Sequence, residues 1–230
     1  MKKLKLLSIY ESLNGVERDV FEGFDEMELS EDYPESFDFN EFKDIRSYGG
    51  KLRYAETHLG KQLGSGSSRI VYRVDNNKVL KIAKNAKGIA QNEVEINWYG
   101  ESYYDSIIAN VIDYDRENSL WVEMELAFKV KNSDFERLWG VKIDDLKKYL
   151  SNMDRENHGK KGFYDIPTDI KYKLDESEDV NTLVSFMLDS DSPSGDLGRK
   201  SSWGLVNRKN GEYLVLVDFG LTNEVYQTYY

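Results

Sequence analysis

The sequence contains no cysteine, only three prolines and only two histidines among its 230 residues. Without cysteine the chain has no disulfide scaffold, no thiolate zinc site and no cysteine nucleophile, which is typical of proteins from reducing compartments. The two histidines, His58 and His158, are far apart in polar surroundings, so we interpret both as surface residues. Thiol chemistry is therefore excluded.

The sequence also lacks a long apolar run. Even the apolar stretch from Leu183 to Leu188 is interrupted by Ser185, whereas a membrane-spanning helix needs about 20 apolar residues. The first residues are basic, but Lys5 interrupts their apolar stretch and Glu11 follows it, which argues against a secretory signal. We therefore expect a cytoplasmic protein with no membrane partner.

Most of the net charge of -11 lies in one segment near the N-terminus. Twelve acidic and two basic residues occur between Glu17 and Asp44, with six aromatic residues spread among them. We interpret residues 1–58 as an acidic N-terminal extension, and the simplest interpretation of its acidic stretch, Glu17 to Asp44, is a solvated segment. The alternatives are that its aromatic residues fold back on the body or dock on a basic protein partner. The same charge repels nucleic acid, which is not expected to bind.

Beyond the extension, the pattern of apolar and polar residues predicts an α+β protein. Alternating β-branched segments predict a β-rich region, and apolar residues at helical intervals then predict a helical region. Residues 152–178 have no clear pattern. The predicted elements are strands at 69–74, 78–82 and 119–126, helices over 89–99, 135–150 and 180–188, and a closing hairpin of 203–206 with 213–217.

A glycine- and serine-rich turn precedes the first of these strands. Its members are Gly64, Ser65, Gly66, Ser67 and Ser68. The two missing Cβ atoms let backbone N–H groups approach a phosphate group closely. Turns of this composition are common, so the feature gains meaning only together with the strand and helix after it.

Lys81 lies inside an apolar strand. Val79 shares its face, whereas Leu80 and Ile82 point to the opposite, core side. A buried ammonium group is costly unless it meets a counter-charge. The sequence should therefore provide a carboxylate close to Lys81.

Two glutamates on the next helix are candidates for that carboxylate. Glu93 and Glu95 point about 200 degrees apart on a helix, so only one can face the lysine. Ile96, Trp98 and Tyr99 come after Glu95 as an apolar helix face would, which favours Glu95.

In this order, the glycine loop, the strand lysine and the helix glutamate resemble the protein kinase family. Arg69 stands where the third glycine of the kinase loop is expected. The matching segments are Gly64-x-Gly66-x-x-Arg69-x-Val71, Val79-Leu80-Lys81, Leu120 to Leu126 and Asp218-Phe219-Gly220. Taken together with the segment from Asp196 to Gly204, these motifs also resemble small kinase-like proteins of tailed bacteriophages.

The resemblance implies a reduced two-lobe kinase-like fold, with a β-rich N-lobe over residues 59–127 and a truncated helical C-lobe over 128–230. Ten residues come after Gly220 in the sequence, so we expect no room for the segment that presents a peptide substrate in protein kinases.

The resemblance further implies that ATP and Mg²⁺ bind between the lobes. Lys81 would hold the α and β phosphates and pair with Glu95, while Asp218 would bind Mg²⁺. Val71 and Val79 would contact the nucleotide. Met124 stands at the gatekeeper position, with Glu125 and Leu126 meeting the adenine.

The catalytic segment departs from the kinase pattern. Asp196 occupies the place of the catalytic aspartate, but Ser201 replaces the second metal ligand and Gly198 replaces a lysine. A hydroxyl of Ser201 or Ser202 remains as a weak Mg²⁺ ligand, and Arg199 or Lys200 could supply the missing positive charge. The alternative for Asp196 is a structural aspartate in a turn.

Two functions are consistent with this sequence. The first is an ATP- and Mg²⁺-dependent kinase-like phosphotransferase in which Lys81, Asp196 and Asp218 are catalytic. The second is a catalytically impaired pseudokinase that serves as a scaffold or virion-assembly protein, with a protein partner bound through the acidic segment. A phage protein would act in the host cytoplasm or in the virion.

Overall fold

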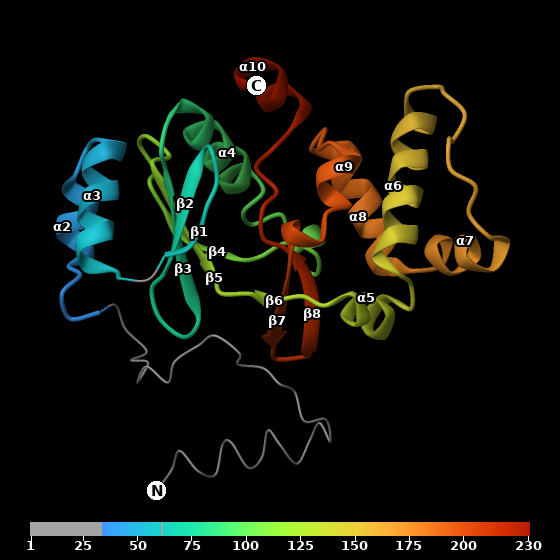
Figure 1. Cartoon of the computed structure of the whole chain (residues 1–230), viewed down its shortest axis with the longest axis horizontal. Coiled ribbons are helices and arrows are strands. Elements are labelled where there is room, and N and C mark those ends of the chain that lie inside the picture. The colour runs from blue at the N-terminus through green and yellow to red at the C-terminus, as the bar shows by residue number, and fades with distance from the viewer. Residues whose placement is uncertain (1–33, 61) are drawn as a thin grey trace, which may run out of the picture.

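The computed structural model describes residues 34–60 and 62–230. The fold is α+β, as expected: a five-stranded antiparallel sheet forms first, and a largely helical region with a three-stranded sheet comes after it. Figure 1 shows the first sheet and its helices on one side of the molecule and most of the later helices on the other. Within the described residues, no helix is both long and apolar enough to span a membrane.

The first sheet has the strand order β1-β2-β3-β5-β4. Its strands are β1 (Gln62–Ser65), β2 (Arg69–Arg73), β3 (Lys78–Ala83), β4 (Val111–Tyr114) and β5 (Trp121–Glu125). The predicted hairpin of β2 and β3 is present, and its turn is held by Asp75, whose Oδ1 accepts a 2.6 Å hydrogen bond from the Asn77 N–H. The register places Val71 opposite Lys81, and Lys81 opposite Val122.

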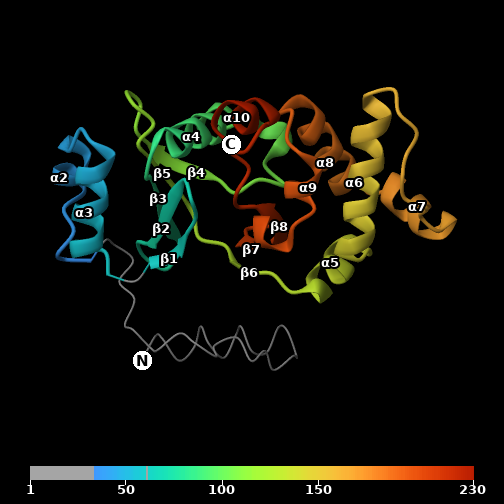
Figure 2. The same ribbon diagram turned by 45° about the horizontal axis from the view of Figure 1, so that its top comes forward.

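The two faces of this sheet differ in what covers them. Leu80 and Ile82 are fully buried in a core formed with α2 (Phe39–Asp44) and α3 (Tyr48–His58). Figures 1 and 2 show these two helices together beside the sheet. The opposite face, which carries Lys81, turns towards α4 (Ala86–Asn97) and the rest of the chain.

The described part of the acidic segment folds back on the body. Phe42 is fully buried, and its ring centroid lies 6.0 Å from that of Trp121 in the sheet. The acidic residues are compatible with a helix here because Asp38 caps α2, accepting hydrogen bonds from the N–H groups of Asn40 and Glu41. The simplest expectation, a solvated extension, is therefore wrong for residues 34–44, and residues 17–33 lie outside the described part of the chain.

The later region contains helices around one apolar core. Besides β4 and β5, the elements beyond α4 are η1 (Ser102–Tyr104), β6 (Phe128–Lys129), α5 (Asn132–Trp139), α6 (Ile143–Asn157), α7 (Thr168–Asp175), α8 (Glu178–Asp189), α9 (Ser194–Leu197), η2 (Lys200–Ser202), β7 (Trp203–Arg208), β8 (Gly211–Leu216) and α10 (Asn223–Tyr229). The segment without a clear sequence pattern thus holds the end of α6 and all of α7. The closing hairpin forms as predicted from β7 and β8.

The two sheets are joined directly. β5 ends at Glu125, and β6, which begins after a gap of only two residues, pairs with β7 in the second sheet. Arg208 at the end of β7 fastens this connection, because its guanidinium binds the carboxylate of Glu125 and donates a 2.9 Å hydrogen bond to the carbonyl of Ile108. The strand β8 is thereby placed next to the face that carries Lys81.

Candidate nucleotide site

Lys81 is held at the junction of β3, α4 and the end of β8. It is 5% exposed, and its Nζ lies 2.9 Å from both carboxylate oxygens of Glu95. The same amine donates a 2.5 Å hydrogen bond to the carbonyl oxygen of Val217. Because a buried ammonium group needs an opposite charge and hydrogen-bond acceptors, these contacts explain how Lys81 is accommodated inside the strand.

Glu95, and not Glu93, is the partner of Lys81. The side chain of Glu95 is fully buried, whereas Glu93 is exposed on the same helix. Glu95 also accepts a 3.3 Å hydrogen bond from the N–H of Phe219. It therefore ties α4 to the segment after β8.

Arg69 is a third charged residue at this position. Its side chain is 7% exposed, and its Nη1 lies 2.8 Å from Oε2 of Glu95. Nη1 also donates a 3.3 Å hydrogen bond to Oδ1 of Asn92, and Nη2 binds Oδ1 of Asp218. In the sequence, Arg69 stood out only as a departure from a glycine. The argument used for Lys81, that a cation in a buried strand needs a carboxylate partner, applies equally to Arg69 and would have indicated its ion pairs.

Asp218 comes directly after Val217 at the end of β8 and faces Arg69. Burial alone would raise its pKa, but the charges of Arg69 and Lys81 outweigh this and hold the pKa below its usual value. Although charged groups crowd around it, 61% of its side chain surface is exposed. Asp218 is thus paired on one side and open to solvent on the other.

The two cations respond differently to their surroundings. Burial lowers the pKa of Lys81, and Arg69 lowers it further against the opposing effect of Glu95. For Arg69, burial also acts to lower the pKa, but the carboxylates of Glu95 and Asp218 outweigh it and the pKa is raised. Arg69 is therefore charged at every working pH, in keeping with the chemistry of a guanidinium group.

The glycine and serine turn is tied to the start of α4. Its tip, Gly66 to Ser67, is exposed, and the Gly66 N–H donates a 2.9 Å hydrogen bond to the carbonyl of Arg69. The Ser68 hydroxyl donates a 2.6 Å hydrogen bond to Gln91 on α4. At Gly88 a Cβ would lie 2.2 Å from the carbonyl oxygen of Ser68, so this glycine permits the close approach.

Lys84 and Asn85 hold the same turn from the end of β3. Lys84 Nζ donates to Oγ of Ser65 at 3.2 Å and to the carbonyl of Gly66 at 2.9 Å. Asn85 Nδ2 donates to the carbonyl of Ser67 at 2.9 Å. Gly64 has open space around it, since a Cβ there would meet no atom within 4 Å.

The segment expected to meet adenine lies at the end of β5. Met124 is 1% exposed and pairs across the sheet with Val79. The side chain of Glu125 is taken by Arg208 and by the Asn110 N–H, which donates at 2.8 Å. The Leu126 N–H donates a 2.6 Å hydrogen bond to the carbonyl of Asn77.

Asp196 lies on α9, and its Oδ1 is 2.6 Å from Nη1 of Arg199. Burial raises the pKa of Asp196, Arg199 opposes this, and the negative charge of Asp218 raises it further. The Ser202 hydroxyl donates a 2.8 Å hydrogen bond to the carbonyl of Asp196, whereas Ser201 is exposed.

These residues do not form a magnesium site as they are arranged. Mg²⁺ prefers a set of oxygen ligands with carboxylates among them. The carboxylate of Asp218 is already paired with Arg69, and the Ser202 hydroxyl is bonded to a carbonyl. Within residues 34–60 and 62–230, no group of three or more acidic or histidine side chains is placed to hold a metal ion.

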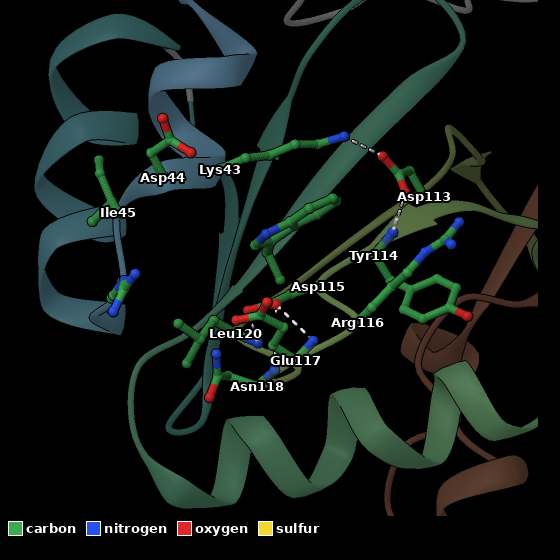
Figure 3. A pocket seen from close by; sticks show the side chains of 12 residues that line it. Lys43, Asp44, Ile45, Asp113, Tyr114, Asp115, Arg116, Glu117, Asn118 and Leu120 are labelled. Carbon is green, nitrogen blue, oxygen red and sulfur yellow. Dashed lines mark hydrogen bonds and ion pairs between the residues drawn. The ribbon is translucent and has the colours of Figure 1, made fainter.

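In the described part of the chain, two of the hollows lie away from these residues. The larger, of about 610 Å³, is lined by residues 43–46 at the end of α2 and by residues 113–118 between β4 and β5. Figure 3 shows Lys43 reaching across it to Asp113, and these side chains are 2.6 Å apart. The smaller, of about 330 Å³, includes Leu52 and Tyr72. Neither hollow includes Lys81 or Asp218. The side chains of Arg69 and Glu95 fill the space between those two residues.

Comparisons with known proteins add little to this geometry. No family model and no curated protein matches the chain. Among solved structures, the streptomycin–ATP–APH(2")-IIa ternary complex matches with 14% sequence identity and a TM-score of 0.29, over 76% of this chain and 72% of that chain. A similarity this low shows neither a shared family nor a shared function.

Proposed function

We propose that the chain binds a nucleoside triphosphate beside Lys81 and acts as a kinase-like phosphotransferase. The observation that supports it is the meeting of Lys81, Glu95 and Asp218. They come from β3, α4 and the segment after β8. Glu95 pairs directly with Lys81, and Arg69 links Glu95 to Asp218. The kinase family joins a lysine, a glutamate and an aspartate in this order for the same purpose.

In this proposal the nucleotide phosphates lie between Lys81 and the glycine turn. Lys81 already has acceptors around it, so a phosphate oxygen would take the place of the Val217 carbonyl while Glu95 keeps the amine in position. The exposed backbone of Gly64, Ser65, Gly66 and Ser67 would cover the phosphates. Met124 and the backbone after it would bound the adenine.

Asp196 would receive the proton in the transfer step. An acceptor hydroxyl forms a new O–P bond to the γ phosphorus, and the bond from that phosphorus to the β–γ bridging oxygen breaks. The hydroxyl proton passes to Asp196, and the nucleoside diphosphate leaves with the electron pair. Burial and the charge of Asp218 raise the pKa of Asp196, which makes it a better proton acceptor than an ordinary aspartate.

A second candidate function is a scaffold without transfer. It is favoured by the pairing of both proposed working carboxylates with arginines, Asp218 with Arg69 and Asp196 with Arg199. In that function the kinase-like body would present surfaces to other proteins, as a virion-assembly component would, and an acidic segment would meet a basic partner.

Nucleotide binding is tested by thermal unfolding with ATP, measured in parallel with Mg²⁺ and with EDTA. A ligand at about a hundred times its Kd stabilises the folded state by about 2.7 kcal/mol, so the melting temperature of the wild type should rise. Lys81→Met should abolish the rise. Lys171→Met is the matched control, because Lys171 is half exposed and its ion pair with Asp175 on α7 is remote from the site. An unchanged wild-type melting temperature in both buffers would refute the proposal.

Transfer is tested separately with radiolabelled ATP and a host lysate as acceptor. Asp196→Asn should remove labelling while leaving the ATP-induced rise in melting temperature. Binding without labelling in the wild type would favour the scaffold. Loss of both binding and labelling in the variant would show that Asp196 is structural.

A further inference from the structure

We propose that Arg69 is the built-in counter-cation of this site, so that the chain binds nucleoside triphosphates without a divalent metal ion. This inference rests on the proposed nucleotide binding and adds the identity of the cation that accompanies it. It starts from the disagreement between the kinase resemblance, which implies Mg²⁺ at Asp218, and the structure, in which Asp218 binds an arginine.

The charges of the site balance without a metal. Arg69 and Lys81 are the cations, and Glu95 and Asp218 are the anions, joined in one chain of contacts. Without Arg69 the group would carry one excess negative charge, which would attract a metal cation. With Arg69 present, an added Mg²⁺ would meet a carboxylate that is already paired and a fixed positive charge beside it. Because Mg²⁺ loses its bound water reluctantly, replacing that water by an already paired carboxylate beside a positive charge is unfavourable.

Arg69 is held too firmly to be displaced at low cost. The Oδ1 of Asn92 accepts a hydrogen bond from Arg69. The Nδ2 of the same amide donates a 2.8 Å hydrogen bond to the carbonyl of Ser119, and this fixes the orientation of the amide. The Glu95 oxygen on its other side is fully buried. Ser68, the preceding residue, packs its carbonyl against Gly88. Moving the guanidinium away would leave Glu95 and Asn92 short of a donor inside the protein.

One side of this group of charges is open to solvent. Asp218 remains 61% exposed on its open side while Arg69 neutralises it from the buried side. A phosphate that approaches Lys81 therefore meets a carboxylate whose repulsion is already offset. In a metal-dependent site the divalent ion would do this.

The test compares ATP affinity with excess EDTA and with Mg²⁺ by calorimetric titration of the full chain. The ATP affinity of the wild type should agree within about threefold between the two buffers. This is less than the tenfold change that about 1.4 kcal/mol represents. Arg69→Gln should lose about tenfold or more in EDTA, and Mg²⁺ should restore part of the loss. Arg69→Lys, which keeps the charge, should retain most of the binding in EDTA.

Arg137→Gln is the matched control. Arg137 also bridges two carboxylates, those of Asp134 and Glu212, but on α5 and β8 away from Lys81. This variant should bind ATP as the wild type does in both buffers. If the wild type binds ATP in the Mg²⁺ buffer but not in EDTA, the inference is overturned and the proposed function stands. If it binds ATP in neither buffer, the proposed function is refuted. EDTA binding that survives Arg69→Gln would also overturn the inference.

A second measurement does not depend on the folding of an Arg69 variant. Mn²⁺ is titrated into the wild type and into Asp218→Asn, and free Mn²⁺ is followed by electron paramagnetic resonance. The two proteins should bind the same amount of Mn²⁺, because the carboxylate of Asp218 is already paired with Arg69. One more Mn²⁺ bound by the wild type than by Asp218→Asn would show that Asp218 is a metal ligand and would end the proposal.

Discussion

Arg69 and Asp218 lie 149 positions apart in the sequence, and their side chains form an ion pair next to that of Lys81 and Glu95. Glu95 contacts both cations, so the two pairs form one electrostatic unit. This unit connects the first strand after the glycine turn with the segment after the last strand. Its stability and its ligand chemistry therefore depend on the same four side chains.

Glu95→Gln should destabilise the protein by about 3–5 kcal/mol, because it leaves two buried cations without their shared carboxylate. The free energy of unfolding is measured by urea denaturation. Glu93→Gln is the control: Glu93 is exposed two positions away on the same helix, and its change should stay within about 0.5 kcal/mol. Equal losses in the two variants would contradict the central role of Glu95.

Gly88→Ala should lower stability although alanine is the better helix former. A Cβ at Gly88 would lie 2.2 Å from the Ser68 carbonyl, and forced overpacking of this kind costs about 1–3 kcal/mol. Gly49→Ala in α3 is the control, because its nearest neighbour, a guanidinium nitrogen of Arg53, is 3.9 Å away. That variant should gain up to about 1 kcal/mol. A gain in both variants would show that the glycine turn does not press on α4.

Phe42→Ala should cost about 3–5 kcal/mol, since a fully buried aromatic ring is removed from the core beneath α2. Phe163→Ala should have little effect because Phe163 is 72% exposed. Chemical denaturation of both variants checks the difference. A small effect of Phe42→Ala would mean that the acidic segment does not pack on the sheet in solution.

The pH dependence of stability should differ in sign between Asp218 and Asp196. The folded pKa of Asp218 is lowered, so its carboxylate contributes stability that is fully present above the unfolded value of about 3.9 and is lost as the pH falls through the folded value. The advantage of the wild type over Asp218→Asn should therefore shrink on acidification through that range.

Asp196 provides the opposite case. Its folded pKa is raised, so ionisation costs stability as the pH rises from about 3.9 through the folded value. Relative to Asp196→Asn, the wild type should gain stability on acidification through that window. Urea midpoints measured across a pH series give both trends, and the same sign for both residues would contradict the assigned charges.

Local pattern was sufficient for much of the fold. The hairpin of β2 and β3 arises from alternating side chains around a short polar turn, and the α4 helix and the closing hairpin arise from their own periodicities. Residues 152–178 escaped prediction because their polar composition carries no period, and α7 is defined there by packing of Leu174 into the core. The larger hollow also had no signal in the sequence, because its two walls come from segments about 70 positions apart, as the Lys43–Asp113 contact shows.

By itself, the sequence determined that a lysine lies in an apolar strand and needs a carboxylate, because an unpaired buried charge is too costly to tolerate. Only the tertiary structure decided that Glu95 also serves Arg69, that Arg69 binds Asp218, and that Phe37 and Phe42 pack under the sheet. The physical reason is range. Periodicity and turn chemistry act over a few residues, whereas the partner of a buried charge or ring is chosen by which distant segments the core brings together.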